Sequence, residues 1–291
     1  MWVAWILASA TVLAFYDLAK KASVRNNAVL PVLLCSTLFG GAAFIGALAL
    51  AGGIGGAVRA GADELALIGV KGLVVSTSWV LTYKALRTLP ITIATPIRAS
   101  APALVFIVAF FAYGECPTLL QGLGMLLVFA GYWAFSWAGR HEGIDFFRSR
   151  AVWFAFGGMV MSACSSLWDK FILQRCAIPV ERVQFWFQID LIAIYSVLLG
   201  LERAFVRERS RFEWRWTIPS VGILLAGADW LYFHGLAIPD VPISVGSLMR
   251  RFSVVITFAL GAILFRERNL ARKGLALLAI VLGIALLCVA R

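Results

Sequence analysis

The sequence predicts an all-α polytopic membrane protein of ten transmembrane helices, arranged as two inverted five-helix repeats. The first observation is composition. Of the 291 residues, 62% are hydrophobic and only 14% are charged, and the mean hydropathy is +0.90. A soluble domain carries about a quarter charged residues, so apolar segments of this length and number indicate membrane helices.

The second observation is an internal repeat with a constant offset. Residues 90–115 and 242–267 are long apolar stretches that share proline, isoleucine, arginine and glutamate at matching positions. The offset is 242 − 90 = 152 residues, and it relates Pro90, Ile91, Arg98 and Glu115 to Pro242, Ile243, Arg250 and Glu267. Asp17 and Asp169, and Gly131 and Gly283, keep the same offset, which indicates an internal duplication.

Each apolar segment defines one expected helix, and the clearest polar segment divides the chain. The stretch at the start has no basic residues before it and runs on past a cleavage-like Ala-Ser-Ala, so it is expected to be a membrane helix, not a signal peptide. The polar linker 140–150 separates the repeats 1–139 and 151–291. The expected helices are 2–20, 29–50, 65–86, 90–113, 118–138, 151–174, 183–201, 217–236, 242–265 and 270–290. A basic loop is expected over 202–215.

The number of helices in each repeat sets their relative orientation. Five is odd, so the second repeat must enter the membrane from the opposite side. Inverted repeats are the usual construction of secondary transporters, with the site between them near the midplane. The expected fourth helix contains Pro96 and Pro102, and interrupted helices at related places also indicate such a site; an ordinary kink is an equal alternative.

The basic residues fall mainly on one side of the predicted topology. The net charge is +11, and 16 of the 26 Lys and Arg lie in the links on one side of the membrane while 4 lie on the other. The positive-inside rule then places the 16 in the cytoplasm and both termini outside, and it accounts for the charge without a nucleic-acid partner.

The sequence offers no signature of a metal or catalytic site. The five cysteines are scattered without metal-ligand spacing, and no hydrolase, metalloprotease or nucleotide-binding motif occurs. We therefore expect no enzyme activity, no catalytic residue, no metal and no cofactor.

Charged residues within apolar helices are the candidate functional residues. Such residues usually face the bundle interior or a water-filled cavity. The candidates for substrate binding are Arg98, Arg250, Arg251, Trp79, Tyr83 and Tyr232. The candidates for proton coupling or ion pairing are Asp17, Asp169, Asp229 and Lys84. Arginine presents a planar fork suited to carboxylate or phosphate, which favours an anion site, whereas the near balance of buried acids and bases equally fits structural ion pairs.

Several motifs in order resemble the EamA-type family of the drug/metabolite transporter superfamily. They are the ends of the fourth and ninth helices, FAYGE (111–115) and LFRER (264–268), the glycine-rich QGLGMLLVFAGYW (121–133) and KGLALLAIVLGIAL (273–286), and FYDLAKKAS (15–23). The Arg250–Arg251 pair also resembles the adjacent basic pair in the ninth helix of sugar-phosphate members.

The resemblance implies a ten-helix carrier that moves small organic metabolites by alternating access, with both termini inside. That orientation is the reverse of the one that the loop charges predict, so the orientation of the termini stays open. We expect an anionic or zwitterionic solute. The alternatives are an exporter of neutral or cationic drugs or amino acids with structural arginines, and a non-transporting membrane scaffold. The expected partners are a small-molecule solute and membrane lipid, with a homodimer left open, and the expected location is the bacterial cytoplasmic (inner) membrane.

Overall fold

Every element in the described part of the computed structural model is helical. The described residues are 2–24, 27–88, 97, 100–137, 149–205, 211–253, 255–257, 260 and 270–289. The first half contains α1 (Trp2–Val24), α2 (Val29–Leu50), α3 (Ile54–Val58), α4 (Ala62–Thr88), α6 (Ala101–Tyr113) and α7 (Leu119–Trp137). The second half contains α8 (Arg150–Lys170), the π-helix η1 (Phe171–Arg175), α9 (Val180–Phe205), α10 (Thr217–Ala237), α11 (Ile243–Met249) and α13 (Leu270–Val289).

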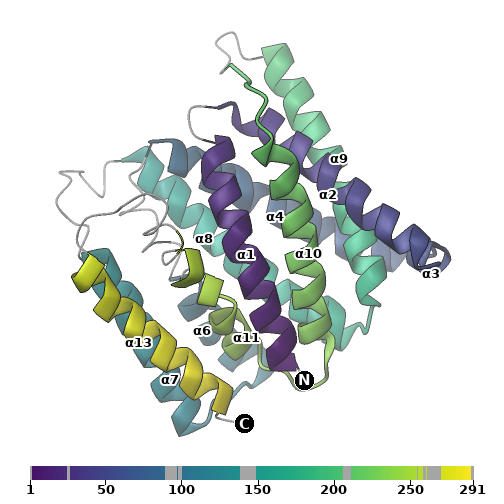
Figure 1. Ribbon diagram of the computed structural model, residues 1–291. Coiled ribbons are helices and arrows are strands. Elements are labelled where there is room, and N and C mark those ends of the chain that lie inside the picture. The colour runs from purple at the N-terminus through teal and green to yellow at the C-terminus, as the bar shows by residue number, and fades with distance from the viewer. Residues whose placement is uncertain are drawn as a thin grey trace.

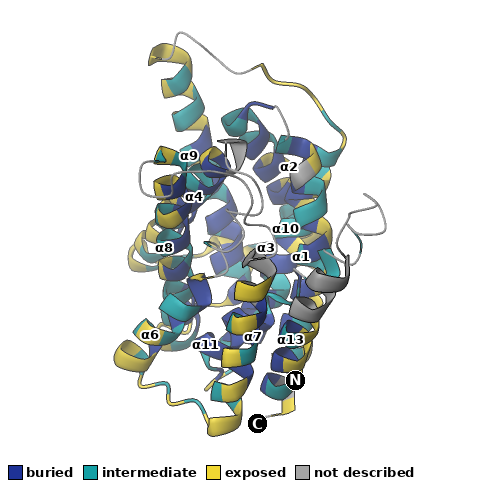
Figure 2. Cartoon of the chain, turned by 90° about the vertical axis from the view of Figure 1, so that its left-hand side faces the viewer, coloured by how far each residue is buried: buried dark blue, intermediate teal, exposed yellow. Residues whose placement is uncertain are grey.

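The helices have the length and the outer surface of membrane-spanning segments. Five are long and apolar enough to cross a bilayer: Trp2–Val24, Val29–Leu50, Ala62–Ala85, Arg150–Arg175 and Val180–Phe205. Shorter apolar helices cover Ala101–Tyr113, Leu119–Gly131 and Leu278–Leu287. Large apolar side chains such as Leu126, Trp133 and Val197 are exposed, and Figure 2 shows exposed positions along the outer sides of the helices. Lipid is the solvent in which such a surface is stable.

Helices of the two halves pack on each other in reciprocal pairs. α1 packs along α10, and α8 packs along α4, so the first helix of each half contacts the third long helix of the other. Likewise α2 contacts α10 while α9 contacts α4, and α2 and α9 contact each other. α7 and α13 form a separate pair at the side of the bundle, as Figure 1 shows.

Glycine allows the closest of these helix contacts. A Cβ atom on Gly222 of α10 would lie 1.7 Å from the carbonyl oxygen of Ser36 on α2. A Cβ atom on Gly283 of α13 would lie 2.6 Å from the carbonyl oxygen of Gly124 on α7. Both helix pairs are therefore held at a separation that only glycine permits, which is a common feature of membrane helix packing.

The chain ends define the two ends of the bundle. Figure 1 shows the N and C marks at one end, which we call the terminal end, and the end of α9 and the start of α10 at the opposite end. The connection from α6 to α7 also lies at the terminal end (Figure 2), as does the connection from α10 to α11 (Figure 1).

The structure interrupts the expected helix over 242–265 at Arg250 and Arg251, and residues 252–253 and 255–257 are helical again. α11 ends at Met249, and Arg250 and Arg251 form a turn. The amide of Arg251 donates to the carbonyl of Leu248, three residues back, at 2.9 Å, so the last turn tightens and the α-helical hydrogen bonding stops. The interruption thus falls at the arginine pair and needs no proline.

Other boundaries also differ from the sequence prediction. α9 runs from Val180 to Phe205 and takes the first residues of the expected basic loop into a helix, and the short α3 was not predicted. The expected helix 151–174 is α8 followed by the π-helical turn η1. Most of residues 89–100 in the expected helix 90–113, including Pro96 and Arg98, lie outside the described residues.

Candidate functional site

Two ion pairs lie in the interior between the halves. The Lys71 ammonium on α4 pairs with the Asp169 carboxylate on α8, with 2% and 7% of the side chains exposed. The Arg250 guanidinium, at the end of α11, pairs with the Asp229 carboxylate at the middle of α10. Asp169 also interacts electrostatically with Asp229 and Arg250, so the two pairs form one polar cluster, the central charge cluster.

Aromatic rings surround the cations of this cluster. Lys71 Nζ lies 4.5 Å from the ring centroid of Phe187 and 4.4 Å from that of Phe233. The Arg250 guanidinium carbon lies 4.3 Å from the ring centroid of Tyr232, which is itself buried. A ring face attracts a cation most strongly where water is excluded, so these rings stabilise both bases within the bundle.

One hydrogen-bond donor of the Arg250 guanidinium has no acceptor. Its Nη2 donates to Asp229, but its Nε is buried and has no hydrogen-bond partner. A buried donor without an acceptor is costly, and Arg250 Nε therefore marks a place where an additional oxygen acceptor would be stabilised. Arg251, the next residue, is half-buried in the same turn.

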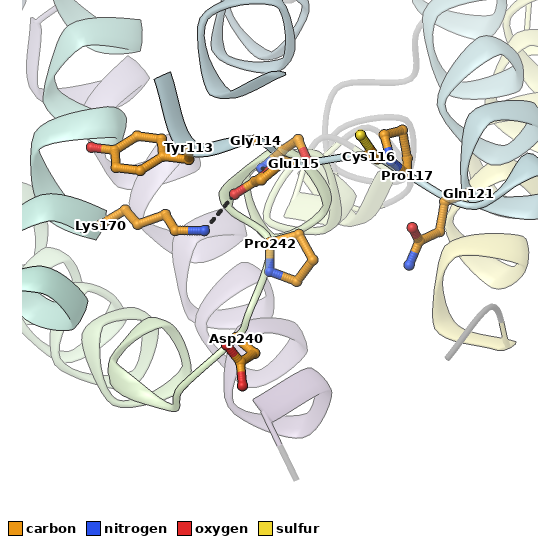
Figure 3. Close-up of a pocket in the computed structure, with 10 residues that line it drawn as sticks. Tyr113, Gly114, Glu115, Cys116, Pro117, Gln121, Lys170, Asp240 and Pro242 are labelled. Atoms are coloured by element: carbon orange, nitrogen blue, oxygen red, sulfur yellow. Dashed lines mark hydrogen bonds and ion pairs between the residues drawn. The ribbon is translucent and has the colours of Figure 1, made fainter. Parts of the chain in front are cut away.

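A third ion pair lies nearer the terminal end, beside a pocket. Lys170 Nζ is 2.6 Å from Glu115 Oε1, with 11% and 8% of the side chains exposed. The pocket has a volume of about 220 Å³. Figure 3 shows this pair among its lining residues, which are Tyr113, Gly114, Glu115, Cys116, Pro117, Gln121, Lys170, Asp240, Pro242 and Ser244.

The structure brings some of the expected residues together and separates others. Asp169, Asp229, Arg250 and Tyr232 meet in the central charge cluster. Trp79 and Tyr83 lie elsewhere: Tyr83 is 12 residues from Lys71 on α4, or about 18 Å along the helix. Trp79 stacks on Tyr195, and the Lys20 ammonium lies over the Tyr83 ring.

The remaining expected residues lie away from the centre or outside the described part. Asp17 is half-buried on α1 and Lys84 is exposed on α4. Arg98 lies outside the described residues. None of the described residues form a group of three or more His, Cys, Asp or Glu side chains that could hold a metal ion.

Sequence reasoning missed Lys71, Phe187 and Phe233. Lys71 interrupts an otherwise apolar stretch, Ile68 to Val75, which is the signal that could have added it to the candidates. The two phenylalanines carry no such signal, because most aromatic residues in these helices serve packing or the membrane interface.

Comparison with known protein families gives a match for the first half of the chain. The model of the EamA-like transporter family matches residues 1–137. Residues 1–137 are therefore similar to members of this family. This confirms the resemblance found in the sequence, and the EamA family consists of membrane transporters. Together with the long apolar helices, it makes the protein an integral membrane protein.

The fold of the whole chain is also found in a solved structure. A solved chain described only as "Crystal structure of protein" superposes with a TM-score of 0.78 over 100% of this chain and 99% of that chain, at 20% sequence identity. At this identity the likeness establishes the shared fold alone. No curated protein sequence matches the chain.

Proposed function

We propose that the protein is a secondary-active carrier that moves small organic metabolites bearing an anionic group, either anionic or zwitterionic, by alternating access. Arg250 carries this proposal. It lies inside the bundle at the interruption of α11, its guanidinium stacks on Tyr232, and its buried Nε lacks an acceptor. A solute carboxylate or phosphate supplies that acceptor in a geometry that the arginine fork favours.

The same proposal includes ten membrane crossings in two inverted repeats, residues 1–139 and 151–291, joined by 140–150. The reciprocal packing supports it: α1 on α10 mirrors α8 on α4, and α2 on α10 mirrors α9 on α4. In such an arrangement the site is expected between the halves, near the midplane. The central charge cluster supports this, because its Lys71–Asp169 pair joins α4 of the first half to α8 of the second. We place the protein in the bacterial cytoplasmic membrane.

In this mechanism Asp229 competes with the solute for Arg250. Asp229 neutralises the guanidinium while the site is empty, which lowers the cost of burying the charge. The solute's anionic group then shares or replaces Asp229, and the freed carboxylate is available to take up a coupling proton. Arg251 and Arg98 are proposed as further contacts to the anionic group.

A second function is favoured by one specific observation. Both bases of the central charge cluster are already paired with carboxylates, Lys71 with Asp169 and Arg250 with Asp229. A carboxylate partner for each base fits a structural role for Arg250, and with it an exporter of neutral or cationic drugs or amino acids.

Thermal shift of the purified protein in detergent distinguishes the two functions. Anionic, zwitterionic, neutral and cationic metabolites are compared on the wild type and on Arg250→Gln, Arg251→Gln and Arg98→Gln. We expect a carboxylate- or phosphate-bearing compound to raise the Tm of the wild type and to lose at least about tenfold in apparent affinity on Arg250→Gln, about the 1.5–3 kcal/mol of a charged hydrogen bond.

The matched control is Arg215→Gln, which removes a half-buried arginine that pairs with Glu213 at the opposite end of the bundle. It should bind the compound like the wild type. Stabilisation by neutral or cationic compounds alone, unchanged in Arg250→Gln, would reject the anion site and support the second function.

A further inference from the structure

The start of α11 is held by a carboxylate from the other half of the chain. Glu115, in the connection after α6, accepts hydrogen bonds from the amides of Ile243 and Ser244 at 2.8 and 3.1 Å. It also accepts the Ser244 hydroxyl at 2.5 Å. These amides belong to the first turn of a helix and have no partner within it, so Glu115 takes the place of an N-cap side chain.

The connection before α11 is held by α8 and η1. Lys170 Nζ, which pairs with Glu115, lies 3.4 Å from the carbonyl oxygen of Val241. Gln174 donates its amide to the carbonyls of Leu236, Ile238 and Val241 at 2.7, 3.3 and 3.2 Å. The π-helical turn that contains Gln174 follows Lys170 directly, and such turns occur frequently at functional sites.

These contacts are connected to the central charge cluster at two points. Asp169, the neighbour of Lys170 on α8, pairs with Lys71. At the other end of the seven-residue α11, whose first turn Glu115 holds, stands Arg250. A displacement of this turn of α8 therefore acts on the Glu115–Lys170 pair and on the central charge cluster together.

The pocket lies directly against the Glu115–Lys170 pair on the terminal side. Figure 3 shows Lys170 and Glu115 joined across it, with Pro242 at the start of α11 beside them. Ser244 of α11 lines the pocket, and Ser247 and Met249, which follow it on α11 before Arg250, are buried.

We propose that the Glu115–Lys170 pair is the gate of the carrier at its terminal end. Glu115 acts as a positioning residue: it holds α11, and through α11 Arg250, in the closed arrangement. Breaking the pair frees the first turn of α11 and opens the passage from the pocket to Arg250. The inference rests on the proposed carrier function, because alternating access requires a contact at each end that can open.

The test measures access to α11 and needs no solute. Ser247→Cys introduces a near-isosteric thiol between Ser244 and Arg250, and its modification by a bulky maleimide is followed by mass spectrometry of the peptide containing residue 247. Lys170→Met and Glu115→Gln in this background should speed modification about tenfold, the scale of a typical coupling between sites. Lys170→Arg, which keeps the pair, should restore the slow rate.

The matched control breaks another ion pair at the same end. Arg182 Nη1 on α9 lies 2.7 Å from Glu64 Oε1. The hydrogen bonds of its side chain go to Glu64 and to the Gly56 carbonyl, so Arg182→Met should leave the rate unchanged. Ser36 on α2 is buried where α2 packs on α10. The thiol of Ser36→Cys should be modified slowly in every variant, which would show that the fold is intact.

The outcomes separate the gate from the solute site. Unchanged labelling of Ser247→Cys in Lys170→Met, equal acceleration by Arg182→Met, or failure of Lys170→Arg to restore the slow rate would overturn the gate. The Arg250 variants could bind every metabolite like the wild type while Lys170→Met and Glu115→Gln still accelerate labelling. That result would reject the proposed solute site and support the proposed gate.

Discussion

At the scale of single residues, a buried ion pair destabilises the protein when one of its two members is removed. Lys71→Met leaves the Asp169 carboxylate almost fully buried without its counter-ion. Loss of one member of a buried pair costs about 3–5 kcal/mol, whereas replacing both members by apolar groups is often neutral. We therefore expect Lys71→Met to lower the Tm in detergent by several degrees, and Lys71→Met with Asp169→Leu to recover most of that loss. A double variant no more stable than Lys71→Met would contradict this account.

The residues of this cluster could be predicted individually but not as pairs. Asp169, Asp229 and Arg250 stand out in the sequence because each is a charge in an apolar segment. The pairing of these residues could not be predicted from the sequence, because Lys71 and Asp169 are 98 residues apart and meet only when α4 packs on α8. The role of Glu115 as a cap for α11 could not be predicted either, because Glu115 contacts Ile243, which lies 128 residues further along the chain.

At the scale of elements, the contact between α2 and α10 depends on one glycine. Gly222→Ala places a methyl group 1.7 Å from the Ser36 carbonyl oxygen, and backbone on both sides must move to relieve the clash. We expect a loss of about 1–3 kcal/mol, as for other overpacked sites, visible as a lower Tm in detergent. Gly227→Ala on the same helix meets nothing within 4 Å and should be neutral or slightly stabilising. Equal Tm values for the two variants would mean that the helices are not held at this separation.

The interruption of α11 shows where sequence signals for helix ends fail. Pro96 and Pro102 predicted an interruption in the fourth helix; the described α6 begins at Ala101 with Pro102 in its first turn, and Pro96 lies outside the described residues. The related helix has no proline after Pro242, and a continuous helix was therefore expected. The turn at Arg250 and Arg251 accompanies the tertiary contacts of Arg250 with Asp229 and Tyr232, which no local propensity encodes.

At the scale of the whole molecule, the duplication was the most informative part of the sequence. A constant offset from Asp17 to Gly283 relates helices that the structure packs reciprocally, such as α1 on α10 and α8 on α4. The offset could not reveal which side chains the halves use differently. Arg251 corresponds to Ala99, and Lys170 to Leu18, so the additional charges of the second half make the interior asymmetric.

The distribution of charge between its ends predicts an orientation of the molecule in the membrane that labelling can test. The exposed Cys116 and Cys176 lie in connections on the terminal side, whereas residues 211–215 precede α10 at the opposite, basic end. The positive-inside rule places the basic end in the cytoplasm, so a membrane-impermeant maleimide should label Cys116 and Cys176 on intact cells and leave Arg211→Cys unlabelled until the cells are lysed. Labelling of Arg211→Cys on intact cells, with Cys116 and Cys176 protected, would instead establish the orientation implied by the family resemblance. In that case the gate formed by Glu115 and Lys170 would face the cytoplasm, and the solute would enter it from there.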